Sequence, residues 1–282
     1  MKLQMRATGT LCMSIMFTCV LIFSATSYAD DNESEGHGAS GRNWVLLIGG
    51  GAEVHPKYIG ADEVEISPIP AIIARYNTQY IDFFIDVEQG AGLSFKLPQY
   101  TSASLSTGIN LGRGRSNTAM SVLRRTAELE MSYLLFGRLD IPLPLGTLGA
   151  QLSYIPISAD YDEAEFKDKD YDGILTEFGW DVEFWLRENL RLGTGIGMSF
   201  ANDDYAKAVY GVEYETERLK KFDPIHGMQN LDMSLELIYM FNQRFGTAMM
   251  TEISYLVGDA ADSPLTRQEV QPFGGLFMFY NF

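Results

Sequence analysis

The sequence predicts an all-β protein, an antiparallel up-and-down transmembrane β-barrel of about 12 strands. Three observations predict this class: strand-length segments with a period of two, alternating short and long connections, and an aromatic last strand that ends on Phe282. A period of two places apolar side chains on one face of a strand, where lipid can cover them. From the last strand alone, the core strand of a soluble sandwich is the alternative.

Residues 1–29 have the pattern of a secretory signal peptide. Lys2 and Arg6 are basic, residues 11–23 form an apolar run of 13 residues, and residues 27–29 give a small-x-small cleavage site. A membrane-spanning helix needs ~20 apolar residues, so this run is too short for an anchor.

The composition predicts a mature chain that has no disulfide and does not bind nucleic acid. Removing the signal peptide removes Cys12 and Cys19, so the mature chain would have no disulfide, and leaves 19 basic against 37 acidic residues, a formal net charge of −18. Nucleic-acid binding needs a positive surface, so we expect no nucleic-acid partner. Residues 30–43 are acidic and glycine-rich, which predicts a disordered segment before a barrel at residues 44–282.

Alternating apolar and polar residues mark the strands. In residues 176–186 the apolar face holds Phe178, Trp180 and Val182, and the other face holds Glu177 and Asp181. A helix would scatter these residues around its axis. The same pattern predicts twelve strands, at 44–54, 63–76, 79–88, 91–97, 102–111, 123–138, 146–159, 173–187, 189–200, 228–241, 243–255 and 269–282.

The connections support a barrel in an outer membrane. Those after even-numbered strands are short, and those after odd-numbered strands are mostly long and polar, as in residues 160–172 and 201–227. Short periplasmic turns and long outer loops are typical of such barrels. Residues 203–221 are compatible with a short helix, and Pro68 and Pro70 predict a bulge or a shorter second strand.

The last strand resembles the C-terminal signal by which the barrel-assembly machinery recognises outer-membrane proteins. Its apolar face holds Leu276, Met278, Tyr280 and Phe282. An apolar edge this close to the chain end is explained if the strand pairs with the first strand and faces outer-membrane lipid. We therefore expect these four side chains to form an assembly signal.

Acidic residues recur on the polar faces of the predicted strands. If the lumen is open they favour cations; alternatively they pair with Arg75, Arg124, Arg138 and Arg191 in a packed interior. A barrel of 12 strands is narrow, which favours a partly filled lumen. The expected lumen acids are Asp82, Asp86, Glu128, Glu130, Asp181, Glu183, Asp232 and Glu236.

Catalytic and metal-binding signals are weak. The mature chain has His37, His55 and His226, none beside a serine motif, so we predict no enzyme, no catalytic residue and no cofactor. Asp168, Asp170 and Asp172 imitate the start of a calcium loop. The acid expected at the twelfth position is missing, so an ordinary acidic outer loop is favoured over a calcium site.

Several motifs, in order along the mature chain, carry a resemblance to the MipA/OmpV family. They are residues 51–62 (GAEVHPKYIGAD), Pro68-Ile69-Pro70, residues 83–95, Gly112-Arg113-Gly114, Tyr205 with Tyr210-Gly211-Val212, residues 256–265 (LVGDAADSPL) and the closing Phe279-Tyr280-Asn281-Phe282. The acidic N-terminal segment and residues 168–173 depart from the family pattern.

The resemblance implies an outer-membrane barrel of a Gram-negative cell. It also implies a scaffold role, in which the barrel joins a murein transglycosylase to a penicillin-binding protein. Other relatives are described as osmotic-response porins or adhesin-like antigens. The sequence therefore leaves two main hypotheses, a non-enzymatic scaffold for peptidoglycan-remodelling enzymes and a narrow, cation-preferring pore; an adhesin using residues 201–227 rests on loop length alone.

Overall fold

The computed structural model describes residues 44–282 except 87–89, 97–103, 111–114, 117–119, 121–122, 124–125, 132, 162–166 and 216–217. The predictions for the signal peptide, residues 30–43, His37 and Arg124 lie outside the described residues. Within them, the elements in chain order are β1 (Trp44–Pro56), β2 (Val64–Asn77), β3 (Ile81–Asp86), β4 (Gly90–Lys96), β5 (Ser104–Asn110), β6 (Glu128–Met131), β7 (Leu134–Pro142), β8 (Thr147–Asp160), β9 (Lys169–Arg187), β10 (Leu190–Ala201), α1 (Asp203–Tyr210), β11 (Gly227–Met240), β12 (Phe245–Leu256), α2 (Asp259–Asp262) and β13 (Val270–Asn281).

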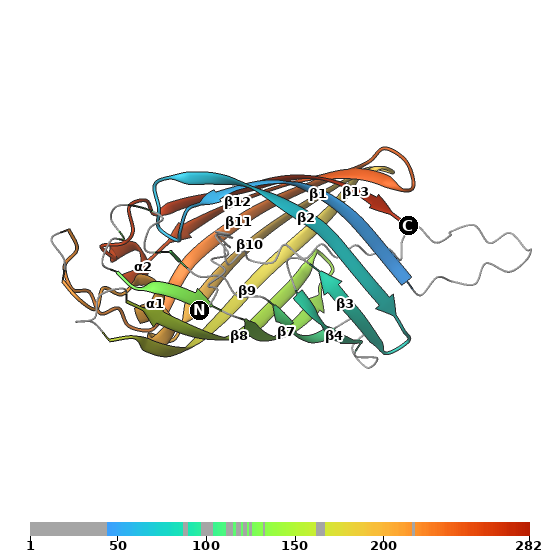
Figure 1. Cartoon of the computed structure of the whole chain (residues 1–282). Helices are drawn as coiled ribbons and strands as arrows, with labels where there is room; N and C mark the ends of the chain where they lie inside the picture. Colours follow the sequence, from blue (N-terminus) through green and yellow to red (C-terminus); the bar gives the residue numbers. More distant parts are fainter. Residues whose placement is uncertain are drawn as a thin grey trace, which may run out of the picture.

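The strands close into one antiparallel barrel (Figure 1). Around the ring the order is β1, β2, β3, β4, β5, β7, β8, β9, β10, β11, β12, β13 and back to β1. At the seam, β1 pairs with β13 from Leu47↔Asn281 to Val54↔Gly274. The predicted fold class, a transmembrane barrel of 12 strands, is therefore confirmed.

The sixth position of the ring is shared by two strands. β7 pairs with β8 over Thr147–Tyr154, and β6 pairs with the same strand over Ile157–Asp160. The single strand predicted at 123–138 is therefore wrong in its bounds, because pairing begins at Glu128, is interrupted before Leu134 and continues to Pro142.

The predicted bulge at Pro68 and Pro70 is also wrong. β2 is a strand of 14 residues whose register with β1 is unbroken from Trp44↔Tyr76 to Pro56↔Val64. β3 pairs only with Ile73–Asn77, and no other described strand covers that side of β2. The prolines therefore lie on a locally free edge, where a missing N–H costs no ladder hydrogen bond.

The two ends of the barrel differ (Figure 1). Trp44, Phe282 and the tight turns lie at the short-turn end; α1 and α2 lie at the opposite, long-loop end. α1 supplies the helix considered for residues 203–221, and the Asn202 side chain caps it by accepting a hydrogen bond from the Tyr205 N–H. Neither helix in the described part of the chain is long and apolar enough to cross a membrane.

The last strand has two apolar faces. Leu276, Met278, Tyr280 and Phe282 are exposed on its outer face, as a lipid-facing assembly signal requires. On the inner face, Phe277 and Phe279 are buried against Leu47, Ile73 and Met250 from β1, β2 and β12. One wall of the lumen at this level is therefore apolar and packed.

Candidate functional site

The long-loop end of the barrel is filled by α1. Along β8 the inward side chains change from polar Ser153 to apolar Ile155 and Ile157. The latter two belong to one buried cluster with Tyr205 and Val209 of α1. The apolar inner face of β8 is buried here because α1 packs against it. The helix therefore acts as a plug in the mouth of the barrel.

Buried hydrogen bonds fasten the loops around this plug. The Tyr58 hydroxyl donates to the Leu265 carbonyl oxygen at 2.9 Å, and the Ser263 hydroxyl donates to the Tyr210 carbonyl oxygen at 2.6 Å. Burial raises the pKa of Tyr58 to about 12, so its hydroxyl stays a donor at neutral pH. Segments far apart in the sequence are thereby held together over the mouth.

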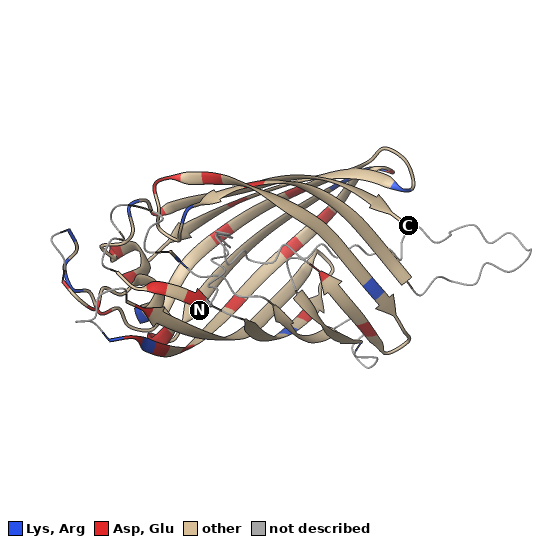
Figure 2. Cartoon of the chain, viewed as in Figure 1, with Lys and Arg blue, Asp and Glu red and all other residues tan. Residues whose placement is uncertain are grey.

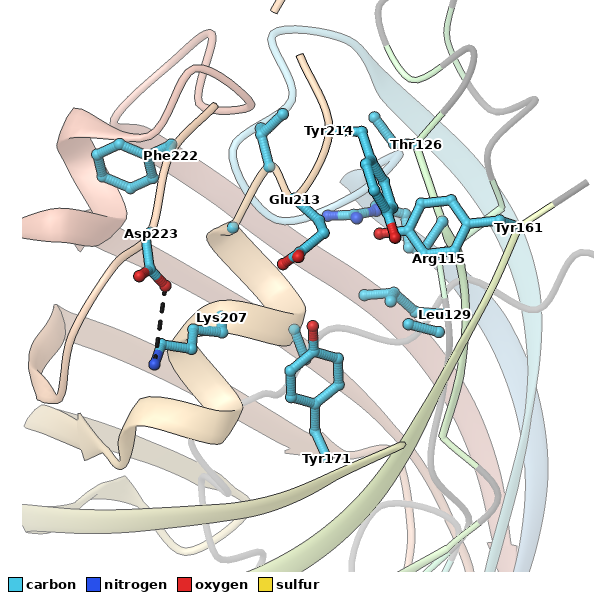
Figure 3. Close-up of a pocket in the computed structure, with 15 residues that line it drawn as sticks. Arg115, Thr126, Leu129, Tyr161, Tyr171, Lys207, Glu213, Tyr214, Phe222 and Asp223 are labelled. Atoms are coloured by element: carbon cyan, nitrogen blue, oxygen red, sulfur yellow. Dashed lines mark ion pairs between the residues drawn. The ribbon is translucent and has the colours of Figure 1, made fainter. Parts of the chain in front are cut away.

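A small pocket lies between α1 and the loops, and Arg115 forms part of its wall (Figure 3). Its volume is about 20 Å³, and Tyr161, Tyr171 and Tyr214 also line it. Arg115 is only 8% exposed; its Nη1 donates to the Val209 carbonyl oxygen at 2.7 Å, while its Nε–H has no hydrogen-bond partner. Desolvation lowers the pKa of Arg115 to about 10, so the guanidinium is still charged at neutral pH.

The other charged groups of the pocket are already paired. Lys169 forms an ion pair with Glu213 at 2.9 Å, and Lys207 forms one with Asp223 at 3.7 Å (the second is dashed in Figure 3). Arg115 forms no ion pair with any described residue. The described pocket therefore carries one uncompensated positive charge in a strongly acidic protein.

In the lumen, the predicted arginines Arg138 and Arg191 form ion pairs, Arg191 with two of the predicted acids and Arg138 with Asp140, which was not predicted. Arg191 contacts Glu236 at 2.8 Å and Glu183 at 3.3 Å, and Arg138 contacts Asp140 at 2.8 Å. These contacts support the packed alternative for this part of the lumen. Figure 2 shows acidic residues at several places along the strands and both acidic and basic residues at the long-loop end.

The remaining lumen acids have mixed surroundings. Asp86 and Asp232 are buried, Asp82 binds Lys96 at 2.9 Å, and Asp181 is half-buried. Asp232 accepts from the Asn230 amide at 2.5 Å through one oxygen, while its other oxygen has no partner.

Glu128 and Glu130 are a correction to the sequence prediction. Both are exposed, and Leu129 between them is buried in the cluster that packs against α1. The prediction assumed that the apolar face meets lipid. At the mouth, the outer face of the strand meets water and the inner face meets the plug. Polar residues therefore face outward there and apolar residues face inward, the reverse of the pattern in the membrane.

The candidate calcium acids do not converge. Asp168, Asp170 and Asp172 lie at the start of β9 or just before it, and their side chains accept hydrogen bonds from Tyr161, Ser158 and Tyr154, respectively. A strand spaces such side chains too far apart for one ion. No cluster that could hold a metal occurs among the described residues.

The structure brings His55 close to Ser67 on the neighbouring strand, which sequence spacing did not reveal. His55 Nε2 lies 3.2 Å from Ser67 Oγ, and Nδ1 lies 2.9 Å from the Pro56 carbonyl oxygen. Glu53 and Glu65 approach Nε2 at 3.9 and 3.8 Å, rather than Nδ1 as in a catalytic triad. His55 is 1% exposed, so this group has the geometry of a buried polar network.

Arg115 was missed by sequence reasoning. It lies in a polar connection after β5, and its neighbours Val209, Tyr161 and Tyr214 come from distant loops. Only the folded mouth deprives its guanidinium of water and of a carboxylate partner.

Comparison with known proteins gives one family and several barrels. Residues 48–282 match the model of the family described as MltA-interacting protein MipA. Comparison with curated proteins gives no match. Solved structures that match are the COG4313 outer membrane channel from Pseudomonas putida F1 (10% identity, 90% of this chain and 99% of that chain, TM-score 0.48), the translocator domain of the autotransporter NalP from Neisseria meningitidis (12%, 89% and 90%, 0.45) and the outer membrane channel DcaP of Acinetobacter baumannii (10%, 88% and 100%, 0.36). At these scores and identities the matches carry no argument about function.

Proposed function

Because the chain belongs to the MipA family and forms an outer-membrane β-barrel, we propose that it is a non-enzymatic scaffold that binds a murein transglycosylase at its periplasmic face. The description of the family as MltA-interacting carries this proposal. Short turns of outer-membrane barrels face the periplasm, so the short-turn end is the docking side.

The packed mouth supports the scaffold function better than it supports an open channel. The buried cluster around Tyr205 and the ion pairs of Arg191 fill space that a wide pore needs.

Capture of purified proteins tests the scaffold. The detergent-folded barrel should retain a purified lytic transglycosylase and, through it or directly, a bifunctional penicillin-binding protein. The paired variants Arg187→Glu and Arg244→Glu change exposed cations near the short-turn end; Lys220→Glu and Lys221→Glu are the matched controls at the long-loop end. We expect weaker capture only from the first pair. Equal capture by both pairs, or none by the unmodified barrel, contradicts periplasmic docking.

A narrow, cation-preferring pore is the second candidate function. It is favoured by buried carboxylate oxygens of Asp232 and Glu236 that have no hydrogen-bond partner. Planar-bilayer recording should then show small, cation-selective conductance that falls in Asp232→Asn. Absence of conductance from folded protein contradicts this candidate and leaves the scaffold intact.

A further inference from the structure

We propose that the Arg115 pocket at the long-loop end binds the carboxylate group of a small organic acid from outside the cell. This goes beyond the proposed scaffold function, which concerns the opposite end of the barrel. The proposal rests on the unused donor edge of Arg115, the charge balance of the pocket and its size.

The donor edge has the geometry that carboxylates prefer. A guanidinium presents N–H groups in planar pairs, and Nη1 of Arg115 is already engaged by Val209. The Nε–H is buried without a partner, so the edge that contains it is left for an acceptor. Two parallel N–H groups match the two oxygens of a carboxylate.

The charge balance favours an anion. Lys169 forms an ion pair with Glu213, and Lys207 forms one with Asp223. Arg115 therefore remains as the excess positive charge. A buried guanidinium without an anion is a costly arrangement that a structural role alone does not explain. A bound carboxylate would compensate it in the same place.

The size of the pocket selects among anions. A water-sized group needs roughly 10–15 Å³ of such space, and the volume of the pocket is about 20 Å³. This space is enough for the two oxygens of a planar carboxylate and fits the larger tetrahedral phosphate less well. The rest of the ligand would lie against the paired rings of Tyr161 and Tyr214, which line the pocket and pack edge to face with centroids 5.3 Å apart.

Acetate is the probe, and folded full-length barrel in detergent is the material. Titration at constant ionic strength, with chloride replaced by acetate, should raise the melting temperature of the barrel in a saturable way. The Nε–H resonance of Arg115 should shift with the same midpoint. Inorganic phosphate at equal ionic strength should produce neither effect.

Three variants separate binding from folding. In Arg115→Met the affinity for acetate should fall at least about tenfold, while the melting temperature without acetate stays equal or rises because an unpaired buried charge is gone. Arg115→Lys keeps the charge but loses the planar pair of N–H donors, so it should bind acetate weakly. This variant also provides the test if Arg115→Met does not fold. Arg244→Met, at the short-turn end, is the matched control and should bind like the unmodified protein.

Three results would overturn the proposal. They are acetate stabilisation that is undiminished in Arg115→Met or in Arg115→Lys, equal stabilisation by phosphate, and no saturable response in the unmodified barrel.

Discussion

The backbone N–H of Phe282 donates to the carbonyl oxygen of Leu46 at 3.0 Å, which ties the last residue of the chain to the first strand. The Phe282 ring is exposed on the outer face and meets Tyr280 edge to face, with centroids 4.9 Å apart. Phe282 thus contributes to barrel closure through its backbone and to the lipid-facing surface through its side chain.

Deletion of Phe282 should reduce the amount of barrel in the outer membrane. The deletion removes an exposed aromatic ring from the assembly face and one hydrogen bond from the seam. Heat-modifiable gel migration of membrane fractions measures the folded form. Phe282→Ala keeps the backbone contact, so equal loss in both variants assigns the effect to the ring. Unchanged levels in both contradict an assembly role.

Gly51→Val should destabilise the seam. A Cβ atom at Gly51 would lie 2.1 Å from the Leu276 carbonyl oxygen, so β1 and β13 would have to separate. Overpacking of this kind costs roughly 1–3 kcal/mol. Denaturant unfolding in detergent measures the loss. The control is Gly137→Val, where no atom lies within 4 Å of the added Cβ; equal losses in the two variants would show that the seam is not the cause.

Arg191→Met should lower the free energy of unfolding by about 3 kcal/mol, because Glu236 would be left as a buried charge without its ion-pair partner. The double variant Arg191→Met, Glu236→Gln should regain part of that loss, since the second change removes the charge. Arg187→Met, which changes an exposed arginine, is the control. Additive losses in the double variant would argue against coupling.

Acid should loosen the loop that follows α1. The backbone N–H and the ring Nδ1 of His226 both contact Asp203 Oδ1, at 2.7 and 2.8 Å, and the first of these contributes most to lowering the pKa of Asp203 below its ordinary 3.8. The contact is therefore complete above pH 3.8 and is lost as the pH falls through the lowered value. Pepsin cleavage within residues 211–226 should increase between pH 4 and pH 2, and Asp203→Asn should remove that pH dependence. If the cleavage at pH 2 relative to that at pH 4 is the same in the unmodified protein and in Asp203→Asn, the contact between Asp203 and His226 is not the cause.

The sequence was sufficient for the barrel but insufficient for its mouth. In the membrane zone lipid lies outside and polar groups lie inside, so alternation at residues such as Phe178 and Glu177 predicts orientation correctly. At Leu129 the same alternation predicts the wrong face, because a helix from a distant loop occupies the interior. The environment of a face is a tertiary property.

Arg115 and Pro68 show the same limit in other terms. The missing partner of the Arg115 Nε–H depends on loops that fold over it. The tolerance of Pro68 depends on where β3 stops pairing with β2. Neither is encoded in the spacing of neighbouring residues.

The length of β9 has a consequence for how the barrel sits in the bilayer. Its 19 residues, Lys169–Arg187, extend about 63 Å along the strand, and a tilt near 40° reduces this to about 48 Å, roughly twice the apolar band of ~25 Å. About half of the strand therefore lies outside the lipid. We expect that half to be the long-loop end, where β9 carries Asp170 and Asp172. Spin labels at Asp170 and Phe184 should report water and lipid, respectively; lipid contact at both would show that the bilayer covers the whole strand.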